Sequence, residues 1–214
     1  PMDTSVISDR LYNWTRDQGQ KGLTSSAVSA IDIALWDIKG QALGVPVYTL
    51  LGGAYRHKAR VYATGLYEPQ GVPSVPAALV EEALGYKRAG FCGMKLKVGY
   101  DLRTDLSYIR AIREAIGSDL YLMVDANHAY NASEAIRLAR AMEPYDVYWF
   151  EEPVPPEDLD GYIEIKRQSK ILIAGGECEY TRYGFRELIN RRVVDVLQPD
   201  LCACGGFSEM LKII

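Results

Sequence analysis

The sequence predicts an α/β protein in which short parallel strands alternate with amphipathic helices. Three observations favour this fold class. Short apolar segments recur from Arg60 onward, stretches with helical spacing lie between them, and acidic residues end several of the segments at nearly constant intervals. Strand–helix–strand units with this spacing form parallel sheets, so we expect βαβ units over residues 60–214.

The composition is that of an ordinary folded protein, with 48% apolar and 24% charged residues among 214. Because 24 Lys and Arg face 28 Asp and Glu, the net charge is −4 and gives no basic surface for nucleic acid or an anionic membrane. The sequence has no apolar run of the ~20 residues that a membrane span needs. Its four cysteines lack a disulfide-framework spacing. We therefore expect a cytoplasmic protein without nucleic-acid or membrane partners.

We expect residues 1–57 to form a separate, helical part. Thr24 or Ser25 can cap its main helix, and Gly44 stops that helix. The apolar positions of this helix recur at helical spacing: Val28, Ile31, Leu35 and Ile38. The pattern changes after residue 57, so we predict one domain over residues 1–57 and a second over 58–214.

Six strands are expected in the second domain, over residues 61–64, 93–98, 121–125, 147–151, 171–177 and 194–200. An apolar stripe marks the helix after the second strand: Leu102, Leu106, Ile109, Ile112 and Ile116. Asn131 and Glu134 resemble a capping box at the start of the next helix. If these strands close into a (β/α) barrel, which has eight strands when complete, six strands form only part of one.

Acidic residues end consecutive predicted strands. Asp125, Glu151 and Glu177 are spaced by 26 residues, one strand–helix unit, and Asp200 follows 23 residues later. In a barrel, the carboxyl ends of the strands form the rim where active sites lie. Side chains alternate between the two faces of a strand, so each acid shares a face with every second residue before it. For Glu177, these residues are Ile173 and Gly175. A single acid at such a position is usually only solvated, but three together suit Mg²⁺.

Two lysines share one face of the predicted strand 93–98. Lys95 and Lys97 alternate with apolar residues, so we expect both ammonium groups to face the barrel interior. Two ammonium groups buried together lower each other's pKa, which would suit Lys97 to act as a general base. The alternative is a surface edge strand guarded by lysines, and the apolar residues on the other face argue against it.

Five segments together resemble the mandelate racemase branch of the enolase superfamily: Met94-Lys-Leu-Lys97, Val124-Asp-Ala-Asn127, Phe150-Glu-Glu-Pro153, Gly175-Gly-Glu177 and Gln198-Pro-Asp200. Residues 30–37 and 50–53 resemble the junction between capping domain and barrel in that branch. More narrowly, four segments resemble galactarolactone cycloisomerases and acid-sugar dehydratases: residues 16–20, 62–65, 182–184 and 200–208.

The resemblance implies an enolase-type (β/α) barrel, incomplete here with about six strands, that follows the helical part of an α+β capping domain. It also implies a Mg²⁺-dependent reaction in which a base removes the proton next to the carboxylate of a small substrate. By position, Asp125, Glu151 and Glu177 would be the metal ligands. Lys97 would be the base, and Lys95 beside it would tune the pKa of Lys97.

The resemblance also implies roles for Asn127 and Asp200, and the position of His128 directly after Asn127 suggests two roles for it. Asn127 would contact the substrate or the metal site. His128 would either contact the substrate or pair with a carboxylate. Asp200 would orient a catalytic histidine, but the only histidines are His57 and His128. We therefore expect the chain to be part of a longer protein that supplies this histidine.

The function expected from the resemblance is abstraction of the proton α to a carboxylate of an acid sugar or its lactone, followed by β-elimination. One alternative is a racemase or epimerase of a hydroxy acid. Another, from a different functional class, is a fragment that keeps the metal site without turnover. The expected partners are a small-molecule carboxylate and, as in relatives, further copies of the same chain.

Overall fold

The computed structural model describes residues 2–214, which divide into two compact units. The first, here called the sheet unit, contains residues 59–175 and 192–197. The second, here called the helical unit, contains the residues up to 58 together with residues 176–191 and 198–214. The division into domains 1–57 and 58–214 stays a prediction.

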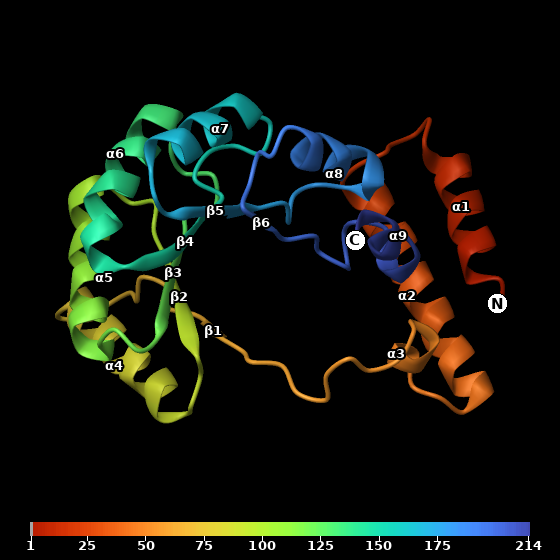
Figure 1. Ribbon diagram of the computed structural model, residues 1–214, viewed down its shortest axis with the longest axis horizontal. Coiled ribbons are helices and arrows are strands. Elements are labelled where there is room, and N and C mark those ends of the chain that lie inside the picture. Colours follow the sequence, from red (N-terminus) through yellow and green to blue (C-terminus); the bar gives the residue numbers. More distant parts are fainter. Residues whose placement is uncertain (1) are drawn as a thin grey trace. The chain divides into compact units, whose positions relative to one another are not determined.

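A parallel sheet of six strands forms the sheet unit (Figure 1). The strands lie side by side in chain order, and each pairs in parallel with the next. They are β1 (Ala63–Thr64), β2 (Gly93–Lys97), β3 (Tyr121–Asp125), β4 (Val147–Glu151), β5 (Leu172–Gly175) and β6 (Val196–Leu197). The predicted α/β class and the six predicted strands are therefore confirmed.

Four helices join consecutive strands and pack beside one another: α4 (Val75–Arg88), α5 (Leu102–Ile116), α6 (Ala132–Met142) and α7 (Leu159–Gln168) (Figure 1). A 3₁₀ turn, η1 (Glu143–Tyr145), follows α6. The predicted stripe of α5 is buried at Ile109, Ile112 and Ile116, whereas Leu102 at the helix start is exposed. The predicted capping box of α6 is present, because Asn131 and Glu134 each accept the other's backbone N–H.

One face of the sheet carries a small buried cluster made of Met123, Trp149 and Ala174. Lys95 lies next to Met123 in the register of β2 and β3, and its neighbours along the strand, Met94 and Leu96, are fully buried. Successive side chains of a strand point to opposite faces, so Lys95 and Lys97 share the face of the cluster. The predicted inward direction of both lysines agrees with this arrangement.

The predicted orientation of the β5 side chains was wrong, because Ala174, and not Ile173 and Gly175, points to the interior face. Ala174 joins the interior cluster, whereas a Cβ atom added to Gly175 would meet the Tyr162 ring of α7 at 3.4 Å. The cause is the register, in which Glu151 pairs with Ala174. Ile173 and Gly175 therefore face the helices, so strand alternation does not carry Glu177 to the interior face.

The helical unit contains five helices among its described residues: α1 (Thr4–Thr15), α2 (Leu23–Leu43), α3 (Val47–Leu50), α8 (Thr181–Asn190) and α9 (Gly206–Ile213). As predicted, α2 ends at Gly44, whose left-handed φ of +66° suits glycine. Within residues 2–214, no helix combines the length and apolar character needed to cross a membrane.

The buried face of α2 is largely polar, contrary to the predicted apolar stripe. Ile31 and Ile38 are 45% and 46% exposed, whereas Asp32 is fully buried. The Asp32 carboxylate accepts the Ser208 backbone N–H at 2.9 Å, and the Trp36 indole donates to the Ser208 hydroxyl at 3.0 Å. The first N–H groups of a helix have no partners inside that helix. At the start of α9, the buried Asp32 of α2 supplies such a partner.

A second fully buried carboxylate, Asp105, lies in the first turn of α5. Burial raises its pKa to about 6 from an ordinary value of 3.8, and the negative charges of Asp101 and Glu68 add to the increase. Backbone N–H groups of Gly99 and Tyr100 oppose it. The native protein therefore holds this proton at a pH where the unfolded chain has released it.

This pKa predicts a stability change with the sign opposite to that of a salt-bridged aspartate. The contribution of Asp105 should be fully present below about pH 4 and should be lost as the pH rises past about 6, by up to about 3 kcal/mol. Urea unfolding of the wild type and of Asp105→Asn between pH 4 and 7 measures it. The stability of the wild type relative to the variant should fall across this interval, and a constant difference would contradict the prediction.

Candidate functional site

The carboxyl ends of β2, β3 and β4 bring the predicted base and two predicted metal ligands into one row. In the register of the sheet, Lys97 lies beside Asp125, and Asp125 lies beside Glu151. Parallel strands end at the same edge, so residues far apart in the sequence become neighbours there. The sequence predicted the neighbouring acids from their 26-residue interval and the inward direction of Lys97 from the period of two along its strand.

Lys95 forms the buried centre of the site. Its Nζ lies 2.5 Å from Glu151 Oε1 and 3.2 Å from Asp125 Oδ2. Both carboxylate side chains are only 1% exposed, and that of Lys95 is 8% exposed. Charges removed from water to this extent require partners, and these three groups supply them to one another.

Lys97 is bound at the outer side of the same cluster. Its Nζ lies 2.6 Å from Asp125 Oδ2 and donates to the Asn127 side-chain oxygen at 2.7 Å. The backbone N–H of Asn127 donates to Asp125 Oδ1 at 3.0 Å, in a loop where Asn127 has a left-handed φ of +41°. Asparagine tolerates that conformation, so the local turn fixes its side chain against the Lys97 amine.

The pKa of Lys95 is raised, whereas the sequence analysis expected Lys95 and Lys97 to lower each other's pKa. Burial does oppose the charged form, but the hydrogen bond and charge of Glu151, with the charge of Asp125, outweigh burial and raise the pKa. The sequence pattern of two lysines did not include the carboxylates that the fold brings against them. Lys95 is thus a fixed positive charge at this rim.

Two aromatic side chains of the site were missed by the sequence analysis. The Trp149 indole N–H donates to Glu151 Oε2 at 3.0 Å, so both oxygens of Glu151 are held. The Tyr67 ring lies 5.5 Å from Lys97 Nζ. Trp149 could have been found from its spacing of two residues from Glu151, whereas Tyr67 follows a short strand and carries no such signal.

His128 pairs with a carboxylate, which was one of its two expected roles. His128 Nε2 lies 3.2 Å from Glu152 Oε2, and the His128 backbone N–H donates to the Glu152 carbonyl at 2.9 Å. Glu152, the residue directly after β4, is 1% exposed. Contact of Asn127 or His128 with a substrate stays a prediction.

Glu177 and Asp200 lie in the helical unit, outside the strands that were expected to end with them. Glu177 follows the end of β5 by two residues and is exposed, because the backbone turns at Gly176 with φ +123°. Asp200 is also exposed and accepts the Cys202 backbone N–H at 2.8 Å. Their roles as third metal ligand and as partner of a catalytic histidine stay predictions.

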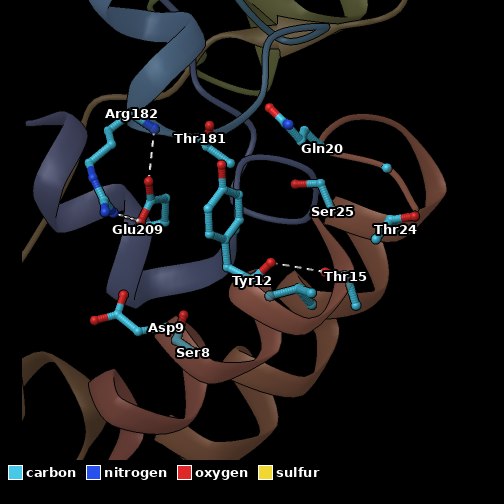
Figure 2. A pocket seen from close by; sticks show the side chains of 13 residues that line it. Ser8, Asp9, Tyr12, Thr15, Gln20, Thr24, Ser25, Thr181, Arg182 and Glu209 are labelled. Carbon is cyan, nitrogen blue, oxygen red and sulfur yellow. Dashed lines mark hydrogen bonds and ion pairs between the residues drawn. The ribbon is translucent and has the colours of Figure 1, made fainter. Parts of the chain in front are cut away.

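A polar pocket lies within the helical unit (Figure 2). Hydroxyl groups make up much of its lining: Ser8, Tyr12, Thr15, Thr24, Ser25 and Thr181. Its charged residues include Arg182 and Glu209, which form an ion pair at 2.6 Å. None of the thirteen residues drawn is a predicted catalytic or metal-binding residue, so this pocket is separate from the predicted chemistry.

Asp125 and Glu151 fit the role of Mg²⁺ ligands. Mg²⁺ prefers carboxylate oxygens, and these two carboxylates are buried side by side at the strand ends. In the structure, the Lys95 and Lys97 ammonium groups supply the positive charge that such buried carboxylates require. The donor set therefore suits a hard cation held beside a lysine amine.

Two family descriptions match the chain. "Mandelate racemase / muconate lactonizing enzyme, N-terminal domain" matches residues 3–52, and "Enolase C-terminal domain-like" matches residues 78–214. Most of the sheet unit lies within the second match, and so do Lys95, Lys97, Asp125 and Glu151.

Three similar proteins illustrate the relationship. The chain is 48% identical to D-galactarolactone cycloisomerase of Agrobacterium fabrum, with 100% of this chain and 56% of that protein covered. The chain is 50% identical in sequence to 3,6-anhydro-D-galactonate cycloisomerase from Zobellia galactanivorans, whose structure matches with a TM-score of 0.93. That match covers 99% of this chain and 58% of the other. L-Talarate dehydratase from Polaromonas, solved with Mg and L-glucarate, is 34% identical with a TM-score of 0.90, and the match covers 100% of this chain and 59% of that one. The chain thus spans somewhat more than half the length of these relatives.

Proposed function

Because the chain belongs to the enolase superfamily, in the branch of the mandelate racemases and muconate lactonizing enzymes, we propose that the protein acts on an acid sugar or its lactone. It removes the proton α to the carboxylate and then eliminates the β-substituent, as a cycloisomerase or dehydratase. The similar proteins above are cycloisomerases and a dehydratase of such compounds, which supports this class of substrate.

The observation that carries the proposal is the buried cluster of Lys95, Lys97, Asp125 and Glu151. Buried charged groups are costly unless the protein uses or compensates them, and functional sites are where such groups collect. Asp125 and Glu151, with Glu177, would hold Mg²⁺. When bound, Mg²⁺ supplies positive charge that stabilises the carboxylate of the substrate after its α-proton has left.

Lys97 is the group that takes the proton. After the Lys97 ammonium has released a proton, its neutral Nζ accepts the α-proton, the C–H electron pair forms the double bond between the α- and β-carbons, and the β-oxygen leaves with the electrons of its C–O bond and a proton from a general acid. Asn127 fixes the Lys97 amine through the 2.7 Å hydrogen bond. Lys95, which lies against Glu151 and Asp125, would place a cation beside the developing negative charge. Asp200 would act by orienting a catalytic histidine.

Exchange of the α-proton tests the proposal. The protein is incubated in D₂O with Mg²⁺ and a panel of hexaric acids, aldonic acids, their lactones and a hydroxy acid without a β-leaving group, and NMR follows the α-position. We expect deuterium at this carbon or an eliminated product from at least one acid sugar, and no exchange when Mg²⁺ is removed by a chelator. Exchange only in a hydroxy acid without a β-leaving group would favour a racemase instead. Absence of exchange across the panel, in protein that binds Mg²⁺, would contradict the proposed substrate class.

A further inference from the structure

Two loops carry the groups around the Lys97 amine. The β2–α5 loop, residues 98–101, directly follows Lys97, and the β3–α6 loop, residues 126–131, contains Asn127. The loops start together, because the Val98 N–H donates to the Asp125 carbonyl at 2.9 Å. The position of Lys97 relative to Asn127 therefore depends on how these loops are held.

The two loops also touch farther from the strands. A Cβ atom added to Gly99 would lie 2.6 Å from the Ala129 Cβ, and Gly99 has a left-handed φ of +114°. Only glycine permits both this backbone conformation and this close approach. The two loops therefore lie in direct contact at Gly99 and Ala129.

Asp105 also connects the two loops. Its fully buried carboxylate accepts the Gly99 N–H at 3.1 Å and the Tyr100 N–H at 3.4 Å, both from the β2–α5 loop. It also accepts a hydrogen bond from the hydroxyl of Tyr130, a buried residue of the β3–α6 loop. A single carboxylate is thus bonded to both loops.

Capping of the helix does not account for Asp105. The start of α5 is already capped by Asp101, whose Oδ1 accepts the N–H groups of Arg103 at 2.9 Å and Thr104 at 3.0 Å. The Asp105 side chain instead bonds groups outside its helix. The raised pKa of Asp105 shows that burial of its charged form is costly. The hydrogen bonds from the loops offset part of this cost.

We propose that Asp105 is a positioning residue, which ties the β2–α5 and β3–α6 loops together and thereby fixes Asn127 against the Lys97 amine. The inference rests on the proposed function in that Lys97 is the base. The hydrogen bonds of Asp105 go to the two loops and not to the Lys97 amine. Its effect is to keep the proton acceptor in one geometry, and errors of about 1 Å in such a geometry reduce rates strongly.

Two variants and one control test the proposal in the purified protein. Tyr130→Phe removes only the hydroxyl through which the β3–α6 loop bonds Asp105. Asp105→Asn replaces one acceptor oxygen by an NH2 group, which cannot accept a hydrogen bond. Glu114→Gln removes one carboxylate charge from the exposed side of the same helix, where Glu114 is 70% exposed. Circular dichroism and unfolding curves establish that each variant is folded.

Hydrogen exchange followed by mass spectrometry gives the first measurement. Both Tyr130→Phe and Asp105→Asn should exchange faster than the wild type in residues 98–101 and 126–131, and Glu114→Gln should not. Unchanged exchange in both loops of both variants would overturn the proposal. This measurement needs no substrate, so it remains decisive for the tie between the loops even where no acid sugar is turned over.

Steady-state kinetics with the acid sugar found in the α-proton assay gives the second. We expect kcat to fall about 10- to 100-fold in both variants while KM stays within about threefold, because the metal ligands remain in place. Faster loop exchange with unchanged kcat would show a merely structural role and overturn the proposal. If the wild type exchanges no α-proton, the proposed function fails, which is a different result from loss of the tie.

Discussion

Replacing Lys97 by alanine is expected to reduce the rate of α-proton exchange at least about 100-fold. Positioned general bases contribute about 10²- to 10⁴-fold to proton transfer, and no other described side chain is held between Asp125 and Asn127 in the same way. Binding of Mg²⁺ should persist, because Asp125 and Glu151 keep their places in the sheet. Deuterium incorporation followed by NMR measures the rate, and isothermal titration calorimetry measures Mg²⁺ binding.

Lys170→Ala is the matched control for this substitution. Lys170 is an exposed lysine of the same unit, just before β5, and is remote in sequence from the cluster. Its replacement should leave the exchange rate unchanged. Full activity of Lys97→Ala would remove Lys97 from the mechanism, whereas loss of activity together with loss of Mg²⁺ binding would point to a damaged metal site.

Replacing Glu151 by glutamine is expected to lower the free energy of unfolding by about 3 kcal/mol or more in the absence of metal. Removing one partner of a buried ion pair leaves the other charge uncompensated, which costs about 3–5 kcal/mol. In the variant, Asp125 alone would face the ammonium groups of both Lys95 and Lys97. Urea unfolding in a chelating buffer measures the difference.

Two further variants separate this effect from a general loss of charge. Glu164→Gln neutralises an exposed carboxylate of α7 and should change stability by less than about 0.5 kcal/mol. Adding Lys95→Met to Glu151→Gln removes the uncompensated ammonium group and should restore much of the lost stability. Equal stability of Glu151→Gln and the wild type would contradict the ion-pair account.

The sequence analysis predicted the strands and the central cluster because both depend on patterns within short segments. Apolar runs and their spacing located β1 to β6, and the period of two placed Lys95 and Lys97 on one face. The parallel register then brought Lys97, Asp125 and Glu151 together at the strand ends. Local periodicity and a regular interval were sufficient for these residues.

Features that depend on contacts between distant segments were not predicted. The facing of β5 and the position of Glu177 depend on the register with β4 and on the turn at Gly176. The polar buried face of α2 follows from Asp32, which accepts an N–H at the start of α9. Hydrophobic periodicity assigns such side chains to the surface, since it carries no information on a partner that satisfies them.

A crystal structure of the protein with Mg²⁺ and a hexarate tests the central claim most directly. We predict one Mg²⁺ bound by Asp125, Glu151 and Glu177, a substrate carboxylate at the metal, and Lys97 Nζ within hydrogen-bond reach of the α-carbon proton. An ion held by other residues, or a hexarate bound with its α-carbon away from Lys97, would contradict the assignment of this cluster as the site of α-proton abstraction.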